Sequence, residues 1–216
     1  MFKDRIEAAD ALAQRLDVWR DGHPLVLGIA RGAVPMAARI AAQLDTDWDV
    51  LLAKKLSAPA NPEFAVGAVD ESGWVYHSEF VKRFGIDDAY LAQEKDRQMA
   101  VMTQRRAQYD AIAPRIDPAG RVVIVVDDGL ATGATMLAAI HGLKQQGAGK
   151  VVCAVPIGSK PSVAAARAAA DELVCLSEPE EFYAVSQGYR EFAQVEDDEV
   201  LELLRQKALA GGAGQG

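Results

Sequence analysis

The sequence predicts an α/β fold whose core is a parallel, doubly wound sheet of five strands. Five short apolar runs begin at residues 25, 49, 122, 151 and 172, and segments with helical periodicity lie between them. The runs lack polar alternation, which is typical of strands covered on both faces, and alternating strands and helices join through right-handed crossovers. Half of the 216 residues are hydrophobic, which is enough for one large core. We expect a single domain over residues 1–209 and a disordered tail over residues 210–216.

Composition limits the partners and the location of the protein. Acidic residues outnumber Lys and Arg by 31 to 23, giving a net charge of -8, which disfavours nucleic acid and anionic membranes as partners. Cys153 and Cys175 lie in apolar runs without a nearby Cys/His cluster, so we expect core residues rather than a disulfide or zinc site. Residues 1–10 carry charges and no signal-peptide pattern, and no apolar run reaches membrane-spanning length. We expect a cytoplasmic protein.

The first strand is followed by a loop that could hold an anion. Apolar residues at helical spacing predict a helix over residues 2–20, and a turn at 21–24 places His23 at the surface. Residues 25–29 form the first strand, and a helix with Pro35 in its first turn runs to about residue 44. Between them, Arg31 lies among small residues and can present a fork of donors to phosphate. The alternative is an ordinary turn with a solvated arginine.

Two lysines follow the second strand, which we place at residues 49–53. The ammonium groups of Lys54 and Lys55 would lie at the same sheet edge as Arg31 and help to offset the charge of a polyanion. Neighbouring side chains alternate across a strand, so one of the two lysines is expected to point into solvent. We favour Lys55 as the one in the site, since it is nearer the tip of the following loop.

The next interval predicts short strands and a long helix. Residues 64–69 and 74–77 have strand character and are joined by a turn. A helix over residues 87–109 mixes apolar and charged positions. Its arginines are expected to form a solvated face: Arg97, Arg105 and Arg106.

The third strand, at residues 122–126, leads into the most informative stretch of the chain. Asp127 and Asp128 follow it at the carboxyl edge, where open α/β sheets bind ligands. Small residues over 129–133 then lead into a helix, and a helix N-terminus preceded by free amides binds phosphate. The carboxylates would repel that phosphate, but they can accept hydrogen bonds from a vicinal diol. A phosphate beside a vicinal diol describes a ribose 5-phosphate. In the alternative interpretation, the acids end a strand and cap a turn, and the threonines start a helix.

The last third of the chain completes the sheet and ends in an aromatic segment. We expect a helix to about residue 146, a strand at 151–156, a helix at 161–170, a strand at 172–176 and a last helix at 198–209. The aromatic residues between 178 and 192 could stack on a flat base or pack on the N-terminal helix, and we favour packing. These residues are Phe182, Tyr183, Tyr189 and Phe192.

Residues 123–135 resemble the phosphoribosyl pyrophosphate (PRPP) signature of the type I phosphoribosyltransferases, with strand, acid pair and Thr-Gly loop in one order. The resemblance implies a pyrophosphate loop formed by Ala30, Arg31 and Gly32 with Lys54, and a cis bond between Ala30 and Arg31. It also implies a flexible lid over about residues 56–80 and a hood built from about 1–22 and 177–209. Candidate lid acids or bases are Glu63, Glu71 and His77, each expected at the surface. The 5-phosphate loop would comprise Gly129, Leu130, Ala131, Thr132, Gly133, Ala134 and Thr135.

The function implied by this resemblance is transfer of ribose 5-phosphate from PRPP to a nitrogenous base or amine, with release of pyrophosphate. Mg²⁺ would bind through PRPP and, through water, the acids. The catalytic residues would be Asp127, Asp128, Arg31 and Lys55, and base contacts could come from Phe182, Tyr183 and Tyr189.

The acceptor and the role in the cell are less constrained by the sequence. Ala131 stands where 6-oxopurine enzymes usually have an Asp, so the acceptor stays open. We expect a homodimer acting in nucleotide salvage and nucleoside metabolism. The alternatives are a PRPP-binding regulator without turnover and, more weakly, an unrelated doubly wound nucleotide-binding protein.

Overall fold

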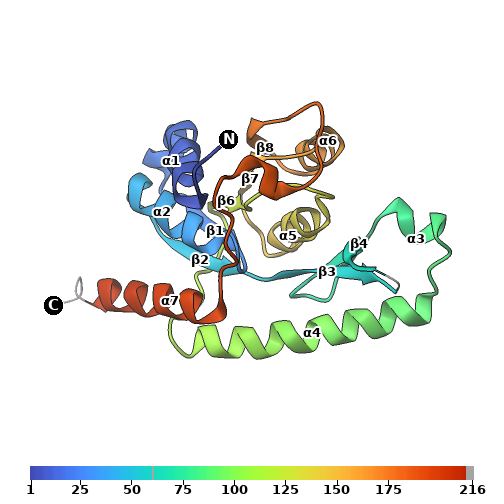
Figure 1. The fold of residues 1–216 in the computed structure, drawn as a ribbon. Helices are drawn as coiled ribbons and strands as arrows, with labels where there is room; N and C mark the ends of the chain where they lie inside the picture. Colours follow the sequence, from blue (N-terminus) through green and yellow to red (C-terminus); the bar gives the residue numbers. More distant parts are fainter. Residues whose placement is uncertain (60, 213–216) are drawn as a thin grey trace.

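The computed structural model describes residues 1–59 and 61–212 and has the predicted α/β architecture (Figure 1). Its core sheet has five strands, all parallel, in the order β2-β1-β6-β7-β8. The strand order reverses between β1 and β6, and open α/β sheets bind ligands at the carboxyl ends of the strands at such a point. The strands are β1 (Leu25–Ile29), β2 (Trp48–Leu51), β6 (Val122–Val126), β7 (Lys150–Ile157) and β8 (Glu172–Ser177).

Helices cover both faces of this sheet, as the unbroken apolar runs predicted. Side chains alternate along each strand, so Ile124 and Val126 of β6 face one layer of helices while Val123 and Val125 face the other. The first layer is α1 (Arg5–Leu16) and α2 (Val34–Leu44), and the second is α5 (Ala134–Gln145) and α6 (Lys160–Ala169). The doubly wound arrangement is therefore confirmed.

The first helix is shorter than the predicted 2–20. The carboxylate of Asp4 caps α1 by accepting the backbone N–H groups of Ile6 and Glu7, both at 2.9 Å. The α-helix ends at Leu16, and the 3₁₀ helix η1 (Asp17–Gly22) continues the chain to the turn at His23, an exposed residue.

A second sheet, which the sequence did not reveal as a unit, lies beside the core. It is antiparallel, in the order β3-β4-β5, with bounds Ala53–Ala58, Asn61–Asp70 and Val75–His77. The predicted strand at 49–53 is divided, because β2 ends at Leu51 and β3 begins at Ala53. Lys54 and Lys55 therefore lie inside β3 and not at the end of a core strand. The interval expected as a flexible lid is largely this sheet.

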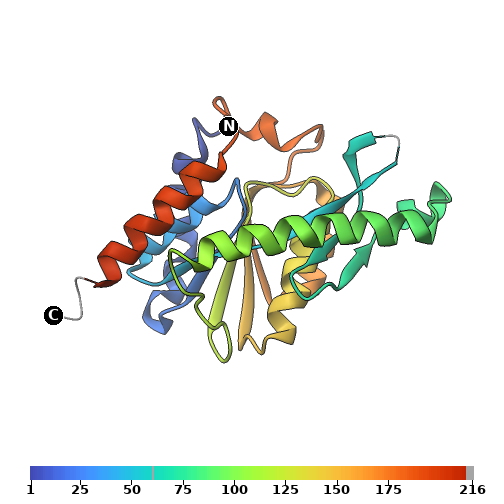
Figure 2. The same ribbon diagram turned by 90° about the horizontal axis from the view of Figure 1, so that it is seen from below.

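Two helices on one side of the molecule hold the second sheet against the core. The long α4 (Asp88–Asp110) follows the short α3 (Glu79–Arg83), and Figure 2 shows α4 and α7 crossing the same side of the structure. Met102 and Tyr109 of α4 pack with Leu204 of α7 against Val50 and Leu56. Helix α7 (Asp197–Gly212) continues through residues 210–212, which were expected to be disordered, and residues 213–216 lie outside the described part.

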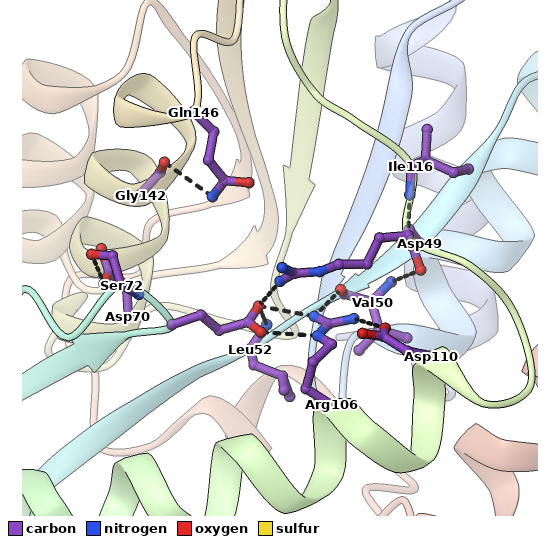
Figure 3. Close-up of polar contacts among 12 residues, drawn as sticks. Asp49, Val50, Leu52, Asp70, Ser72, Arg106, Asp110, Ile116, Gly142 and Gln146 are labelled. Atoms are coloured by element: carbon purple, nitrogen blue, oxygen red, sulfur yellow. Dashed lines mark hydrogen bonds and ion pairs between the residues drawn. The ribbon is translucent and has the colours of Figure 1, made fainter.

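A partly buried ion-pair network joins the turn between β4 and β5 to α4. Arg106 donates from Nε and Nη2 to the two carboxylate oxygens of Glu71, at 2.9 and 2.8 Å, and from Nη2 to the Val50 carbonyl at 2.9 Å (Figure 3). Arg115 donates to Glu71 at 2.6 Å. Only 17% of the Glu71 side chain and 12% of the Arg106 side chain are exposed. The expectations of a surface Glu71 and a solvated Arg106 were therefore wrong.

The other two lid candidates are not joined to this network. His77 is exposed at the end of β5. The side chain of Glu63 lies outside the described residues. Over residues 1–59 and 61–212, no helix is both long and apolar enough to cross a bilayer.

Candidate active site

A pocket of about 310 Å³ lies at the carboxyl end of β6, where the sequence placed a phosphate. Residues 128–135 form one wall, and Lys55, Ala65 and Val185 complete the lining. Gly133 is the N-cap of α5 with φ +72°, a conformation that favours glycine because it has no Cβ. The N-terminus of α5 therefore opens toward the pocket, and its N–H groups and dipole favour an anion there.

The start of α6 fixes residues 129–135, the candidate phosphate loop, from behind. The backbone of Leu130 exchanges hydrogen bonds with Ile157 and Ser159, each 2.9 Å long. The hydroxyls of Ser159 and Ser162 both donate to the Ala131 carbonyl, at 3.0 and 2.6 Å. With that carbonyl held from behind, the loop is preorganised. The two serines were missed in the sequence because a Ser at a helix N-terminus is ordinarily read as a cap.

The acid pair lies beside the pocket and is held by the N-terminal helix. Asp128 Oδ2 accepts hydrogen bonds from Arg5 Nε at 3.0 Å and Nη2 at 2.8 Å, and the Asp128 carbonyl accepts the Tyr189 hydroxyl at 2.6 Å. The guanidinium of Arg5 lies 3.9 Å from the centroid of the Phe192 ring. Asp127 accepts the Asp128 backbone N–H at 2.9 Å. Arg5 was not predicted, although a cation in the first turn of a helix opposes the dipole and could have signalled a specific role.

Burial shifts the titration of both acids. It raises the pKa of Asp127 well above the ordinary value of 3.8, and the charge of Asp128 raises it further. Burial also raises the pKa of Asp128, while the charge of Arg5 and its hydrogen bonds oppose this shift. An ionised pair is therefore costly here without donors from a ligand, which a sugar diol would supply.

We predict that Asp127→Asn raises the melting temperature at pH 7. A carboxyl whose pKa is raised on folding contributes its full stabilisation when the pH is below its pKa in the unfolded chain. This stabilisation is lost as the pH rises through the pKa of the carboxyl in the folded protein. Asparagine keeps the oxygen that accepts the Asp128 N–H but has no charge. Melting curves from pH 3 to 8 should show a gain that shrinks toward low pH. A variant less stable than the parent at pH 7 would contradict the prediction.

The loop after β1 touches the acid pair. The peptide bond between Ala30 and Arg31 is cis, as expected. A Cβ built on Gly32 would lie 2.3 Å from Asp128 Oδ2, so the glycine permits this close approach. The side chain of Arg31 is 21% exposed, and its Nη1 lies 3.1 Å from Glu196 Oε2 and 3.5 Å from Asp197 Oδ2.

The two lysines of β3 lie on opposite faces of the strand. Lys55 lines the pocket with Asp128 and the phosphate loop. Lys54 is grouped instead with Arg31 and Arg105, whose charges act on it. Both lysines are half-buried, so the expectation that one points into solvent was wrong.

The aromatic residues of the C-terminal segment do not line the pocket. Tyr189 is 5% exposed, and its ring centroid lies 6.1 Å from that of Phe2 and 4.8 Å from that of Phe192. Phe182 packs on the core cluster beneath α1 and α2. Tyr183 is 81% exposed, with its hydroxyl on Glu181. Except for Tyr183, these rings pack against other parts of the protein, which is the arrangement we favoured over stacking on a base. The lining residue from this segment is Val185, whose methyl groups lie where a side chain at Gly129 would be.

The donors available for a metal ion are few. Among the described residues, no group of three or more His, Cys, Asp or Glu side chains could hold a metal ion. Asp127 and Asp128 supply carboxylates, and Arg5 already engages one of them. Magnesium commonly completes its shell with waters and substrate phosphates, so these residues fit an ion carried largely by a phosphorylated ligand.

Comparisons with known proteins agree on one family. The model of the phosphoribosyl transferase domain matches residues 3–190. Two curated proteins from Mycobacterium tuberculosis, both named "Putative phosphoribosyl transferase", are 42% identical over 205 residues, covering 94% of this chain and 46% of each relative. The chain thus spans about half the length of these relatives. The crystal structure of TT1426 from Thermus thermophilus is 40% identical with a TM-score of 0.78, covering 95% of this chain and 98% of that one. The chain therefore belongs to the phosphoribosyltransferase family.

Proposed function

We propose that this protein transfers ribose 5-phosphate from PRPP to a nitrogenous acceptor and releases pyrophosphate, with Mg²⁺ bound through PRPP. The observation that carries the proposal is the contact between its two loops. The phosphate pocket, the acid pair and the loop of Arg31 form one continuous surface, because Gly32 abuts Asp128 and Asp128 lines the pocket. That order matches the order of 5-phosphate, diol and pyrophosphate along PRPP.

Each part of the surface has a chemical role in this proposal. The amides of residues 129–135 and the hydroxyls of Thr132 and Thr135 bind the 5-phosphate. The carboxylates of Asp127 and Asp128 accept the ribose hydroxyls and stabilise positive charge as the bond from the anomeric carbon to pyrophosphate breaks. Arg5 favours the ionised form of Asp128 and fixes its orientation. Bound Mg²⁺ would neutralise charge on the departing pyrophosphate.

The pocket wall bears on the acceptor. Ala65, Ala131 and Val185 are among the residues that line the pocket, and their apolar side chains cannot hydrogen-bond to an oxopurine. We therefore keep the acceptor as a base or an amine. Base contacts from Phe182, Tyr183 and Tyr189 would require those rings to move. Nucleotide salvage, a homodimer and a cytoplasmic location belong to the same proposal.

A thermal-shift titration tests PRPP binding. Mg²⁺ and millimolar PRPP should raise the melting temperature of the parent chain, since a ligand that binds only the folded state stabilises it. Asp128→Asn should weaken the apparent affinity by about 10- to 100-fold, the effect of losing a hydrogen bond to a charged group. No shift of the parent chain at millimolar PRPP would remove the proposed function.

A regulatory role without turnover is the second candidate. It is favoured by one observation: Glu196 and Asp197 engage Arg31, so the chain itself occupies one of its proposed pyrophosphate-binding groups. Pyrophosphate release should be measured with adenine, guanine, xanthine, uracil, orotate and simple amines as acceptors. Turnover with any of these supports the enzyme, and silence with all of them despite PRPP binding supports the regulator.

A further inference from the structure

Three cationic side chains from separate parts of the chain gather beside the pyrophosphate loop. They are Arg31 after β1, Lys54 of β3 and Arg105 of α4, and we call them the cation cluster. Burial, together with the charges of Arg105 and Arg31, lowers the pKa of Lys54 to about 8. Half-buried like charges repel one another unless an anion lies between them.

The anion now between the arginines is the start of α7. Arg105 Nη2 lies 3.1 Å from Asp197 Oδ2, and Arg31 Nη1 lies 3.5 Å from the same oxygen. Arg31 also contacts Glu196 at 3.1 Å. The side chains of Asp197 and Glu196 are 43% and 66% exposed, whereas that of Arg105 is 16% exposed. Because the two carboxylate side chains remain partly in contact with solvent, another anion could reach the arginines and replace them.

Buried polar atoms without a hydrogen-bond partner also lie in and beside the cation cluster. Within the described structure these include Arg105 Nη1, the Tyr109 hydroxyl and Asp197 Oδ1. Tyr109 is 1% exposed and lies one helical turn from Arg105 on α4. A buried donor left unsatisfied is costly, and native proteins leave few of them. Two donors and one spare carboxylate oxygen indicate that the present anion does not satisfy the site.

We propose that Arg105 is a third pyrophosphate-binding side chain, and that Glu196 and Asp197 occupy the cation cluster until the pyrophosphate group of the ligand displaces them. This inference rests on the proposed function. The position of Asp197 Oδ2, reached by two arginines, is where a phosphate oxygen would bind. A pyrophosphate group has more acceptor oxygens than a carboxylate, and the planar fork of Arg105 suits phosphate geometry.

Calorimetric titration of the full chain with Mg²⁺-pyrophosphate, and separately with ribose 5-phosphate, tests this inference. Arg105→Gln should lower the affinity for pyrophosphate by about 10-fold or more, the effect of losing a hydrogen bond to a charged group. It should leave ribose 5-phosphate binding unchanged, and Arg105→Lys should be intermediate. Asp197→Asn should strengthen pyrophosphate binding severalfold by removing a competitor. Arg205→Gln removes the same positive charge as Arg105→Gln but at an exposed position of α7, so it is the control and should behave as the parent.

The outcomes separate this inference from the proposed function. If the parent chain binds neither compound, both fail. If the parent binds both and Arg105→Gln binds pyrophosphate equally well, Arg105 has no role in that site. Equal losses for both compounds would mean that Arg105 acts only through the fold. Weaker pyrophosphate binding by Asp197→Asn would contradict the proposal that pyrophosphate displaces Glu196 and Asp197 from the cation cluster. Should Arg105→Gln fail to fold, Arg105→Lys and Asp197→Asn decide the question.

Discussion

Arg106→Met is expected to lower the free energy of unfolding by about 3 kcal/mol, because it removes the less exposed of the two arginines that neutralise the largely buried Glu71 carboxylate. Glu71 would keep Arg115, whose side chain is 45% exposed, and a 3.4 Å hydrogen bond from the Leu52 N–H, while the Val50 carbonyl would lose the Arg106 donor. Methionine keeps much of the apolar stem, so the loss is one of charge and hydrogen bonds. Chemical denaturation with a constant m-value measures the change.

Two variants control this stability prediction. Arg205→Met breaks an exposed pair with Glu202 and should change the free energy of unfolding by about 0.5 kcal/mol or less. Adding Glu71→Gln to Arg106→Met should recover part of the loss, since the largely buried carboxylate charge that faced Arg106 is then removed. A cost below about 1 kcal/mol for Arg106→Met would show that the network does not hold the second sheet to the core.

Gly32→Ala is expected to weaken Mg²⁺-PRPP binding by about 10- to 100-fold, the effect of misplacing one charged hydrogen-bonding group. The new Cβ would lie 2.3 Å from Asp128 Oδ2, so either the loop or the carboxylate must move. Arg5 holds that carboxylate through two hydrogen bonds, which limits how far it can turn. Calorimetric titration of PRPP into the variant measures the loss.

Gly22→Ala is the matched control, because a Cβ built there meets nothing within 4 Å. It should bind PRPP as the parent does. If Gly32→Ala also binds as the parent does, the loop after β1 and the acid pair do not act on the same ligand.

The core fold could be predicted because each core strand is an apolar run bounded by turns. The observed bounds of β1 and β6 are those expected, since Val122–Val126 is continuously β-branched and Asp127 ends it. The antiparallel sheet could not be separated from the core in the same way. The apolar run at 49–53 continues through the junction between β2 and β3, and no Gly or Pro marks the change of sheet.

The segments that we propose bind the ligand were predictable as local patterns, whereas their side-chain partners were not. The loop of Arg31 and the stretch 127–135 each follow a strand, so the sheet brings them to one edge. Arg5 and Asp128 are 123 positions apart, and Arg105 and Asp197 are 92 apart. A charged face on a helix looks solvated unless such distant partners are known, which is why Arg105 and Arg106 were misassigned.

The structure of the chain with Mg²⁺ and PRPP bound is the most direct test of the central claim. The 5-phosphate should lie on the amides of residues 129–135, the diol on Asp127 and Asp128, and the pyrophosphate against Ala30 to Gly32. PRPP bound in another pocket, or bound here with the two phosphate ends exchanged, would contradict the assignment of this site.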